Sequence, residues 1–329
     1  MIRHTALVTL LILLIGGSAA AFEPEEVGKR ALLIGISNYE NLKPLRGADR
    51  DVELMATVLT GRFAFEPDNV RVLRNENATY DTIMANLKLL AESTGPNDVV
   101  YVHFSGYGSQ VVDQSGEELD RFDESVVPYD GRGSAPDILD DDIETFLRDI
   151  VAKTRNVTIT LDVCYTTEYS RRGTQGRCID AEYASEKQVF QSSFSEPDDK
   201  FVEARREIAI LQAARRGSIA NETLFDSGVY GVLTYELAHS MLNAPANATF
   251  GSVLEQVDAH VSARFPSQKV DIDLKRRDEP MLFVPDARSQ FGGLVSVLDE
   301  NNTVRLQGGV AQGFEVGRSV DIYAPGTRD

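Results

Sequence analysis

Short apolar runs alternate along the chain with stretches in which apolar residues recur every three or four positions. The runs at residues 30–36, 70–73, 98–104 and 157–161 are bounded by turns, which is typical of strands buried on both faces. Helical spacing covers residues 49–59, 80–91 and 140–151. Strands that alternate with helices at this pitch predict an α/β fold with a mostly parallel central sheet covered on both faces.

The pattern changes after residue 165. Residues 165–205 are polar and lack periodicity, which predicts a long exposed loop of the kind that often serves a function. Further strands are expected at 207–211 and 281–284, and helices at 229–241 and 249–264. We therefore assign residues 22–285 to one domain. Residues 286–329 alternate apolar and polar positions between glycines, which predicts a small β module, complete or incomplete at Asp329.

The first 21 residues have the pattern of a secretory signal peptide. A basic start is followed by an apolar run and then by small residues ending at Ala20 and Ala21. The alternative is an uncleaved membrane anchor, but the run is shorter than the roughly 20 apolar residues that span a bilayer. We expect the mature protein to be exported to a periplasm or the extracellular space, without a transmembrane segment.

Composition narrows the possible partners. The net charge of −18 argues against nucleic acid as a ligand, because phosphates are bound by lysine and arginine. At 42% hydrophobic, the chain can bury a full core. Its two cysteines, Cys164 and Cys178, could form one structural disulfide in an oxidising compartment. The sequence around Cys164 also allows a different role for this thiol.

Two loops follow neighbouring apolar strands. One reads Phe-Ser-Gly-Tyr-Gly-Ser-Gln at 104–110, and the other reads Leu-Asp-Val-Cys-Tyr-Thr at 161–166. In open parallel sheets, ligands and catalytic groups gather at the carboxyl ends of the strands. The glycines of the first loop allow a sharp turn and a close backbone approach, and the second loop places a thiol directly after a buried strand. The two loops therefore predict a site at this edge.

These loops, with the segments at 31–36, 45–51, 123–130, 138–143 and 228–237, resemble the caspase-fold (peptidase C14-like) cysteine peptidases. The resemblance is to the metacaspase (orthocaspase) branch and covers about residues 30–284. It implies a caspase-like three-layer sandwich and makes Cys164 the nucleophile. The family carries Ser-Gly-His-Gly where this chain has Ser-Gly-Tyr-Gly, so Tyr107 stands at the position of the histidine base.

The resemblance also implies ligand sites. Residues matching the acidic pocket for a substrate arginine or lysine are Asp51, Ser105 and Asp162. No cofactor is required, but calcium-dependent members bind the ion through carboxylates that match Asp123, Asp140 and Asp141. The position of a fourth ligand holds Arg171. The run of carboxylates at 140–142 also fits the start of a helix, where the helix dipole favours negative charge, and this interpretation is favoured over calcium binding.

Tyrosine is a poor substitute for the histidine base. A positioned base contributes about 10²–10⁴-fold to a rate. A tyrosine pKa near 10 leaves roughly one phenolate in a thousand at neutral pH. Three functions therefore remain open. The first is a catalytically impaired endopeptidase cutting after arginine or lysine, including within its own loop at Arg171, Arg172 or Arg177. The second is a pseudopeptidase that binds basic peptides or a partner protein, and the third is a structural module.

Overall fold

The computed structural model describes residues 27–112, 122–165, 176–179, 207–215, 217–225, 227–284, 294–298 and 304–307. The predicted signal peptide, most of the loop at 165–205 and most of the tail therefore lie outside the described residues. Among the residues described, no helix combines the length and the apolar character needed to cross a bilayer.

A six-stranded sheet forms the centre of the domain, with the strand order β11-β8-β7-β3-β1-β2. In chain order its members are β1 (Lys29–Gly35), β2 (Val70–Arg74), β3 (Val99–Ser105), β7 (Val157–Asp162), β8 (Ala209–Gln212) and β11 (Asp271–Asp273). The first five strands are parallel, and β11 runs antiparallel to β8 at one edge. The predicted mostly parallel sheet is confirmed.

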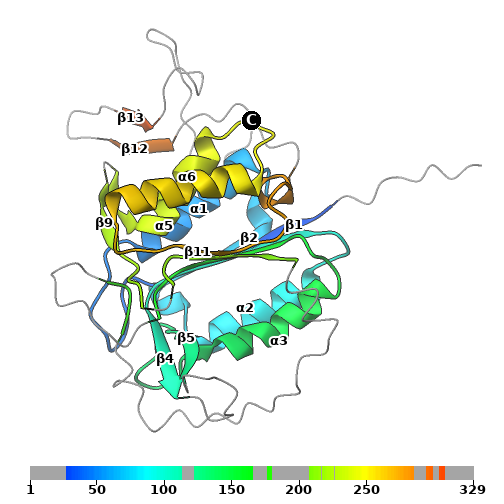
Figure 1. Ribbon diagram of the computed structural model, residues 1–329. Helices are drawn as coiled ribbons and strands as arrows, with labels where there is room; N and C mark the ends of the chain where they lie inside the picture. The colour runs from blue at the N-terminus through cyan, green and yellow to red at the C-terminus, as the bar shows by residue number, and fades with distance from the viewer. Residues whose placement is uncertain are drawn as a thin grey trace, which may run out of the picture.

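Helices cover both faces of this sheet, giving three layers (Figure 1). On one face lie α1 (Ala48–Arg62), α5 (Val232–Asn243) and α6 (Phe250–Arg264), and on the other lie α2 (Tyr80–Ser93) and α3 (Asp140–Val151). Alternation along β3 supplies both layers: Val99 and Tyr101 belong to the core under α1, α5 and α6, whereas Val100 belongs to the core under α2 and α3. The all-apolar runs in the sequence are therefore explained by burial on two faces.

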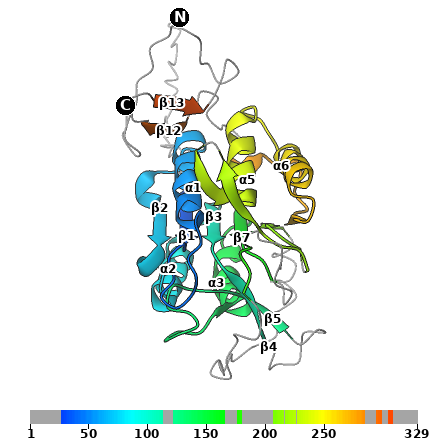
Figure 2. The ribbon, with the colours of Figure 1, turned by 90° about the vertical axis from the view of Figure 1, so that its left-hand side faces the viewer.

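Smaller elements surround the sheet. An antiparallel group consists of β4 (Gly108–Val112), β5 (Phe122–Val126) and β6 (Ile138–Leu139), and Figure 2 shows β4 and β5 at the same end of the molecule as α3. A hairpin joins β9 (Glu222–Phe225) to β10 (Gly228–Gly231). Single 3₁₀ turns are η1 (Pro67–Asn69), η2 (Asn75–Asn77) and η4 (Met281–Phe283). These strands have two to five residues each, which is too short for hydrophobic periodicity to predict them.

The prediction of a strand at 281–284 is wrong, because residues 281–283 form a 3₁₀ turn. Leu282 and Phe283 have φ values of 54° and 57°, in the left-handed region, so the backbone turns where extension was expected. The side chains of η4 are nevertheless buried, which explains why the segment is apolar. In the tail, β12 (Leu294–Leu298) pairs antiparallel with β13 (Val304–Gln307), and the rest of the expected β module lies outside the described residues.

Candidate active site

The carboxyl edge of the sheet brings together the three residues expected to form a recognition pocket. Ser105 ends β3 and lies opposite Asp162, the last residue of β7, in the strand register. Asp51 comes from the first turn of α1, and the Ser105 Oγ donates a hydrogen bond of 2.6 Å to its Oδ2. All three residues are fully buried. Alternation places Ser105 on the α1 and α5 side of the sheet, since its neighbour Phe104 packs in the opposite core.

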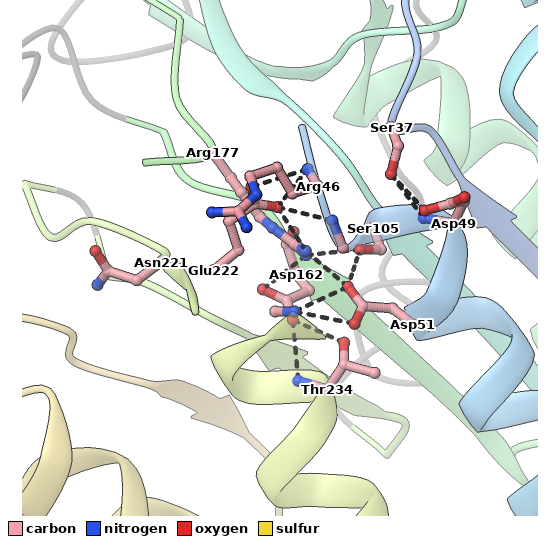
Figure 3. A network of polar contacts seen from close by, with 12 residues as sticks. Ser37, Arg46, Asp49, Asp51, Ser105, Asp162, Arg177, Asn221, Glu222 and Thr234 are labelled. Atoms are coloured by element: carbon pink, nitrogen blue, oxygen red, sulfur yellow. Dashed lines mark hydrogen bonds and ion pairs between the residues drawn. The ribbon is translucent and has the colours of Figure 1, made fainter. Parts of the chain in front are cut away.

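The guanidinium of Arg177 fills this pocket (Figure 3). Its Nη2 lies 2.8 Å from Asp51 Oδ2 and 3.5 Å from a carboxylate oxygen of Glu222. Its Nη1 lies 3.4 Å from Asp162 Oδ1 and donates a hydrogen bond of 2.6 Å to the Ser105 Oγ. The arginine side chain is fully buried. We call Asp51, Ser105, Asp162 and Glu222 the acidic pocket.

Two backbone N–H groups and one side-chain hydroxyl hold the carboxylates of Asp51 and Asp162 in place. Gly231 N donates to both oxygens of Asp51, at 3.0 and 3.2 Å, and Thr234 donates to Asp162 Oδ2 from its N at 2.9 Å and from its Oγ1 at 2.7 Å. Both donors belong to the start of α5, where the helix dipole favours negative charge. Gly231 has no side chain for a further reason, because a Cβ there would overlap Arg177 and Asp162.

The carboxylate of Glu222 is held by the turn that precedes α1. Glu222 on β9 accepts hydrogen bonds from Arg46 N at 2.8 Å and Gly47 N at 3.1 Å, just before α1 begins. The acidic pocket is thus assembled from four separate parts of the chain: the start of α1, the ends of β3 and β7, and the β9 hairpin. Charge-assisted bonds of this kind are the strong ones in protein interiors.

Electrostatics favour a cation in this pocket. Burial raises the pKa of Asp51, the positive charge of Arg177 lowers it and repulsion from Asp162 raises it again, giving a pKa of about 6. For Arg177, burial acts to lower the pKa, but Asp51, Asp162 and Glu222 together outweigh it and raise the pKa above its usual range. Three carboxylates around one guanidinium leave an excess of negative charge, so an empty pocket would be costly.

Cys164 is joined to Cys178 by a disulfide, with a Cα–Cα distance of 5.1 Å. The sequence left open whether these cysteines pair, and in the structure they do. Cys164 follows β7 directly and is fully buried, and Cys178 is nearly so. Because the chain has two cysteines, neither sulfur is a free thiol here. The predicted nucleophile is at the predicted place, but its sulfur is bonded.

Tyr107 is a packed side chain on the other side of the sheet edge. It belongs to the core under α2 and α3, and its ring centroid lies 5.1 Å from that of Tyr39. The Tyr39 hydroxyl accepts a hydrogen bond of 2.7 Å from Tyr107 N, which fixes the loop after β3. Burial raises the pKa of Tyr39 far above its usual value, so this hydroxyl keeps its proton.

His103 is not placed to act as the missing general base. It is fully buried on β3, and its ring nitrogens lie 3.5 Å from the Tyr101 hydroxyl and 3.4 Å from the Thr234 hydroxyl. Burial, followed by repulsion from Arg177, lowers the pKa of His103 to about 3. The ring is therefore neutral at physiological pH and packed beneath the acidic pocket.

The residues expected to bind calcium lie near one another. Asp123 is on β5, and Asp140 and Asp141 begin α3, which follows the β6 partner of β5. Partial burial, then repulsion from Asp141, Glu124 and Asp123, raises the pKa of Asp140 to about 7. Within the described ranges, no group of three or more His, Cys, Asp or Glu side chains could hold a metal ion. Arg171 lies outside those ranges, and calcium binding stays a prediction.

Sequence reasoning missed four members of the network. Gly231 and Thr234 lie in a segment that resembles the family, but nothing in their residue type indicates carboxylate binding. Glu222 lies on a short hairpin without periodicity. The sequence indicates Arg177 only as a cleavage position. Its place next to Cys178 is a further signal, because a Cys164–Cys178 disulfide brings Arg177 close to Cys164.

Comparison with known proteins relates part of this chain to one protein family. Residues 29–170 match the family described as "Metacaspase, peptidase C14 domain". Metacaspase-1A of Aspergillus oryzae is 31% identical over 144 residues, which are 42% of this chain and 34% of that protein. Metacaspase-1 of Coccidioides immitis is 27% identical over 254 residues, or 73% of this chain and 52% of that protein. The chain thus spans about a third to a half of these relatives.

Two solved structures share the fold. Protein GSU0716 from Geobacter sulfurreducens superposes with a TM-score of 0.61 at 19% identity, covering 74% of this chain and 92% of that one. Caspase-1 from Spodoptera frugiperda gives a TM-score of 0.51 at 14% identity, covering 76% and 88%. At these identities the likeness concerns the fold. Residues 29–170 thus match the metacaspase peptidase C14 domain in sequence, and the structure has the fold of caspase-like proteins.

Proposed function

We propose that this domain recognises arginine in a peptide or protein and that its cleavage chemistry is impaired, which makes it a pseudopeptidase of the metacaspase type. The observation that carries the proposal is the guanidinium of Arg177 held by three buried carboxylates and a serine hydroxyl. A pocket that holds this group within the chain has the shape and charge to hold the same group from another chain.

Arginine fits the pocket better than lysine. Its two terminal nitrogens reach different partners, Nη2 toward Asp51 and Glu222 and Nη1 toward Ser105 and Asp162. A lysine ammonium is a single point charge on a flexible stem, so it cannot span these partners at once. We therefore expect arginine peptides to bind more tightly than matched lysine peptides.

Impaired cleavage follows from the surroundings of Cys164. Its sulfur is bonded to Cys178, and the position of the family histidine holds Tyr107, packed against Tyr39. His103 on β3 is neutral and enclosed. Without a neighbouring group that accepts a proton near pH 7, only a few per cent of the reduced Cys164 is in the thiolate form.

A slow endopeptidase is the second candidate, and one observation favours it. The backbone N–H groups of Gly108 and Cys164 both donate to a single carbonyl oxygen, at 3.0 and 3.4 Å. Paired donors of this kind stabilise the oxyanion that forms when a thiolate attacks a peptide. This half of a peptidase site does not depend on the residue at position 107.

One assay separates the two candidates. The full chain, treated with dithiothreitol to free Cys164, is incubated with a fluorogenic arginine peptide and its lysine counterpart, beside Cys164→Ala, Tyr107→His and Tyr107→His/Cys164→Ala. We expect binding without turnover for the parent and arginine-directed turnover for Tyr107→His, about 10²–10⁴-fold above the parent. Fast turnover by the parent that Cys164→Ala abolishes would refute the pseudopeptidase. Absence of binding by every variant would refute arginine recognition.

Export of the protein belongs to the same proposal. The signal-like first 21 residues and the Cys164–Cys178 disulfide both suit an oxidising compartment. Expression with the native leader, followed by fractionation and N-terminal sequencing, tests it. A mature protein that begins near Phe22 is expected, and a retained leader would count against export.

A further inference from the structure

The segment Gly176-Arg177-Cys178-Ile179 lies across the site and pairs through its main chain with a different segment on either side of a bend at Arg177. Gly176 forms an antiparallel bridge with Asn221, and Cys178 forms a parallel bridge with Gly108. Arg177 N donates to Ala220 O at 2.9 Å, and Ile179 N donates to Gly108 O at 3.0 Å. Main-chain pairing with alternate side chains in pockets is a common way for proteins to bind extended peptides.

The backbone of Arg177 is placed as that of a residue to be cleaved. Its carbonyl oxygen is the one that accepts from both Gly108 N and Cys164 N, while its side chain enters the acidic pocket. The bond that follows this carbonyl joins Arg177 to Cys178. The sulfur that would attack the carbonyl carbon belongs to Cys164, and that sulfur is bonded to the side chain of Cys178.

We propose that Gly176–Ile179 is an internal occupant of the arginine site, docked in the manner of a substrate, and that the Cys164–Cys178 disulfide locks it there until a dithiol reductant makes it exchangeable. This proposal rests on the proposed function, because it assigns the acidic pocket to arginine. In the releasing step, two electrons and two protons pass from the dithiol to the sulfur pair. Cys164 and Cys178 become thiols, and the dithiol becomes a cyclic disulfide.

The disulfide sets how often the docked segment leaves the acidic pocket. Reduction removes the cross-link but leaves the ion pairs of Arg177 intact, so the segment stays bound part of the time and exchanges with competing peptides. A cross-link closing a loop of about 15 residues is worth about 100-fold in an equilibrium constant by the loop-closure estimate. Reduction should therefore raise the accessible fraction of Arg177 without unfolding the domain. The same step frees Cys164, so ligand access and thiol availability change together.

The first experiment follows the lock without any peptide. The full chain is treated with phenylglyoxal, which modifies accessible guanidinium groups, before and after reduction by dithiothreitol, and each arginine is quantified by peptide mass mapping. We expect Arg177 to be protected in the oxidised protein and modified about tenfold faster or more after reduction. Cys178→Ser should show the fast rate with or without reductant, which makes it the matched control for side effects of the reductant.

Two other arginines calibrate the result. Arg132 is also buried and ion-paired, to Asp137, but no disulfide holds it, so its slow modification should not change on reduction. Arg215 is largely exposed and should react in every sample. If Arg177 stays as protected as Arg132 when mass spectrometry shows both thiols free, or stays protected in folded Cys178→Ser, the lock is refuted.

The second experiment separates the lock from arginine recognition. Binding of a fluorescently labelled arginine peptide is measured for the oxidised protein, the reduced protein and Cys178→Ser. We expect no binding to the oxidised form and binding to the other two, weakened by Asp51→Asn. Equal binding before and after reduction would refute the internal occupant. If Arg177 becomes reactive on reduction and yet no variant binds the peptide, the lock stands and arginine recognition by the proposed function fails.

Discussion

Two neighbouring regions of this site differ in the forces that define them. The acidic pocket is built from buried charges, each with several directional partners, on the α1 and α5 side of the sheet. The region around Tyr107 is aromatic and packed, on the α2 and α3 side. The acidic pocket and Cys164 thus lie on one side of the sheet, and the position of the family's histidine base lies on the other. In the proposed function, a change at residue 107 alone removes the base and leaves the pocket intact.

The largest expected effect comes from removing the cation. Arg177→Met should destabilise the fold by about 3–5 kcal/mol at pH 7, because three buried carboxylates lose their common partner. Urea unfolding of the disulfide-intact protein measures the loss. Arg177→Lys keeps the charge without the planar fork and should lose less. A loss below about 1 kcal/mol for Arg177→Met would mean that water replaces the guanidinium easily, and the contrast between the two regions would weaken.

The next effect concerns the cross-link. Cys178→Ser and Cys164→Ser each remove the same disulfide, whose 14-residue separation corresponds to about 3 kcal/mol of loop-closure free energy. We expect each variant to lose about 2–3 kcal/mol of unfolding free energy. Under reducing conditions, parent and variants should converge. Unequal losses in the two variants would indicate that one sulfur has a structural role beyond the cross-link.

A pH dependence tests the enclosed histidine beneath the pocket. The folded pKa of His103 is about 3, below its ordinary value near 6.5, so between these values the unfolded chain binds the extra proton. Its contribution to stability is complete above pH 6.5 and is lost as the pH falls toward 3. Relative to His103→Gln, the parent should lose about 2 kcal/mol between pH 7 and pH 4.5.

The contribution of Asp51 to stability changes with pH in the opposite direction. Its folded pKa of about 6 exceeds the unfolded value of 3.8, so its ionised form weakens the fold as the pH rises from 3.8 through 6. Because Asp51 is present in both proteins, the difference between parent and His103→Gln isolates the histidine. Urea unfolding across pH 4.5–7 provides the measurement. Parallel curves for the two proteins would mean that His103 is protonated in the folded state.

The smallest effect is expected in the acidic cluster before α3. Partial burial and then repulsion from its acidic neighbours raise the pKa of Asp140, and solvent screens the repulsion. Asp140→Asn should raise thermal stability slightly at pH 8 and not at pH 4, where the carboxyl is protonated. Asp81→Asn removes a similar exposed carboxylate from the first turn of α2 and should lower stability slightly through the helix dipole. A calcium-dependent thermal shift that Asp140→Asn removes would support the metal site.

The central sheet could be predicted from the sequence because burial on two faces leaves uninterrupted apolar runs. The segments 30–36, 98–104 and 157–161 fall on β1, β3 and β7 within two residues at either end. Residues 281–284 show the limit of this signal. Their burial was correctly indicated by their apolar character, but positive φ angles make a turn there, and burial alone does not report backbone direction.

The candidate site was predictable where it follows a strand end and hidden where it depends on long-range contacts. Ser105 and Asp162 could be placed together because parallel strands share an edge. The contact between Glu222 and Arg177 joins a hairpin to a short segment that is flanked by polar residues, and no periodic pattern encodes it. The same holds for the support of Tyr107 by Tyr39, residues that lie 68 positions apart.

The bond from Tyr107 N to the Tyr39 hydroxyl has a consequence for optical spectroscopy. The chain contains 11 tyrosines and no tryptophan, so tyrosine dominates its near-ultraviolet signal. Burial raises the pKa of Tyr39, Tyr101 and Tyr165 above the usual range, which keeps these phenols protonated in alkali while exposed ones ionise. An alkaline absorbance titration therefore reports the packing around these three phenols without an added label, since its late phase marks the opening of the cores that bury them.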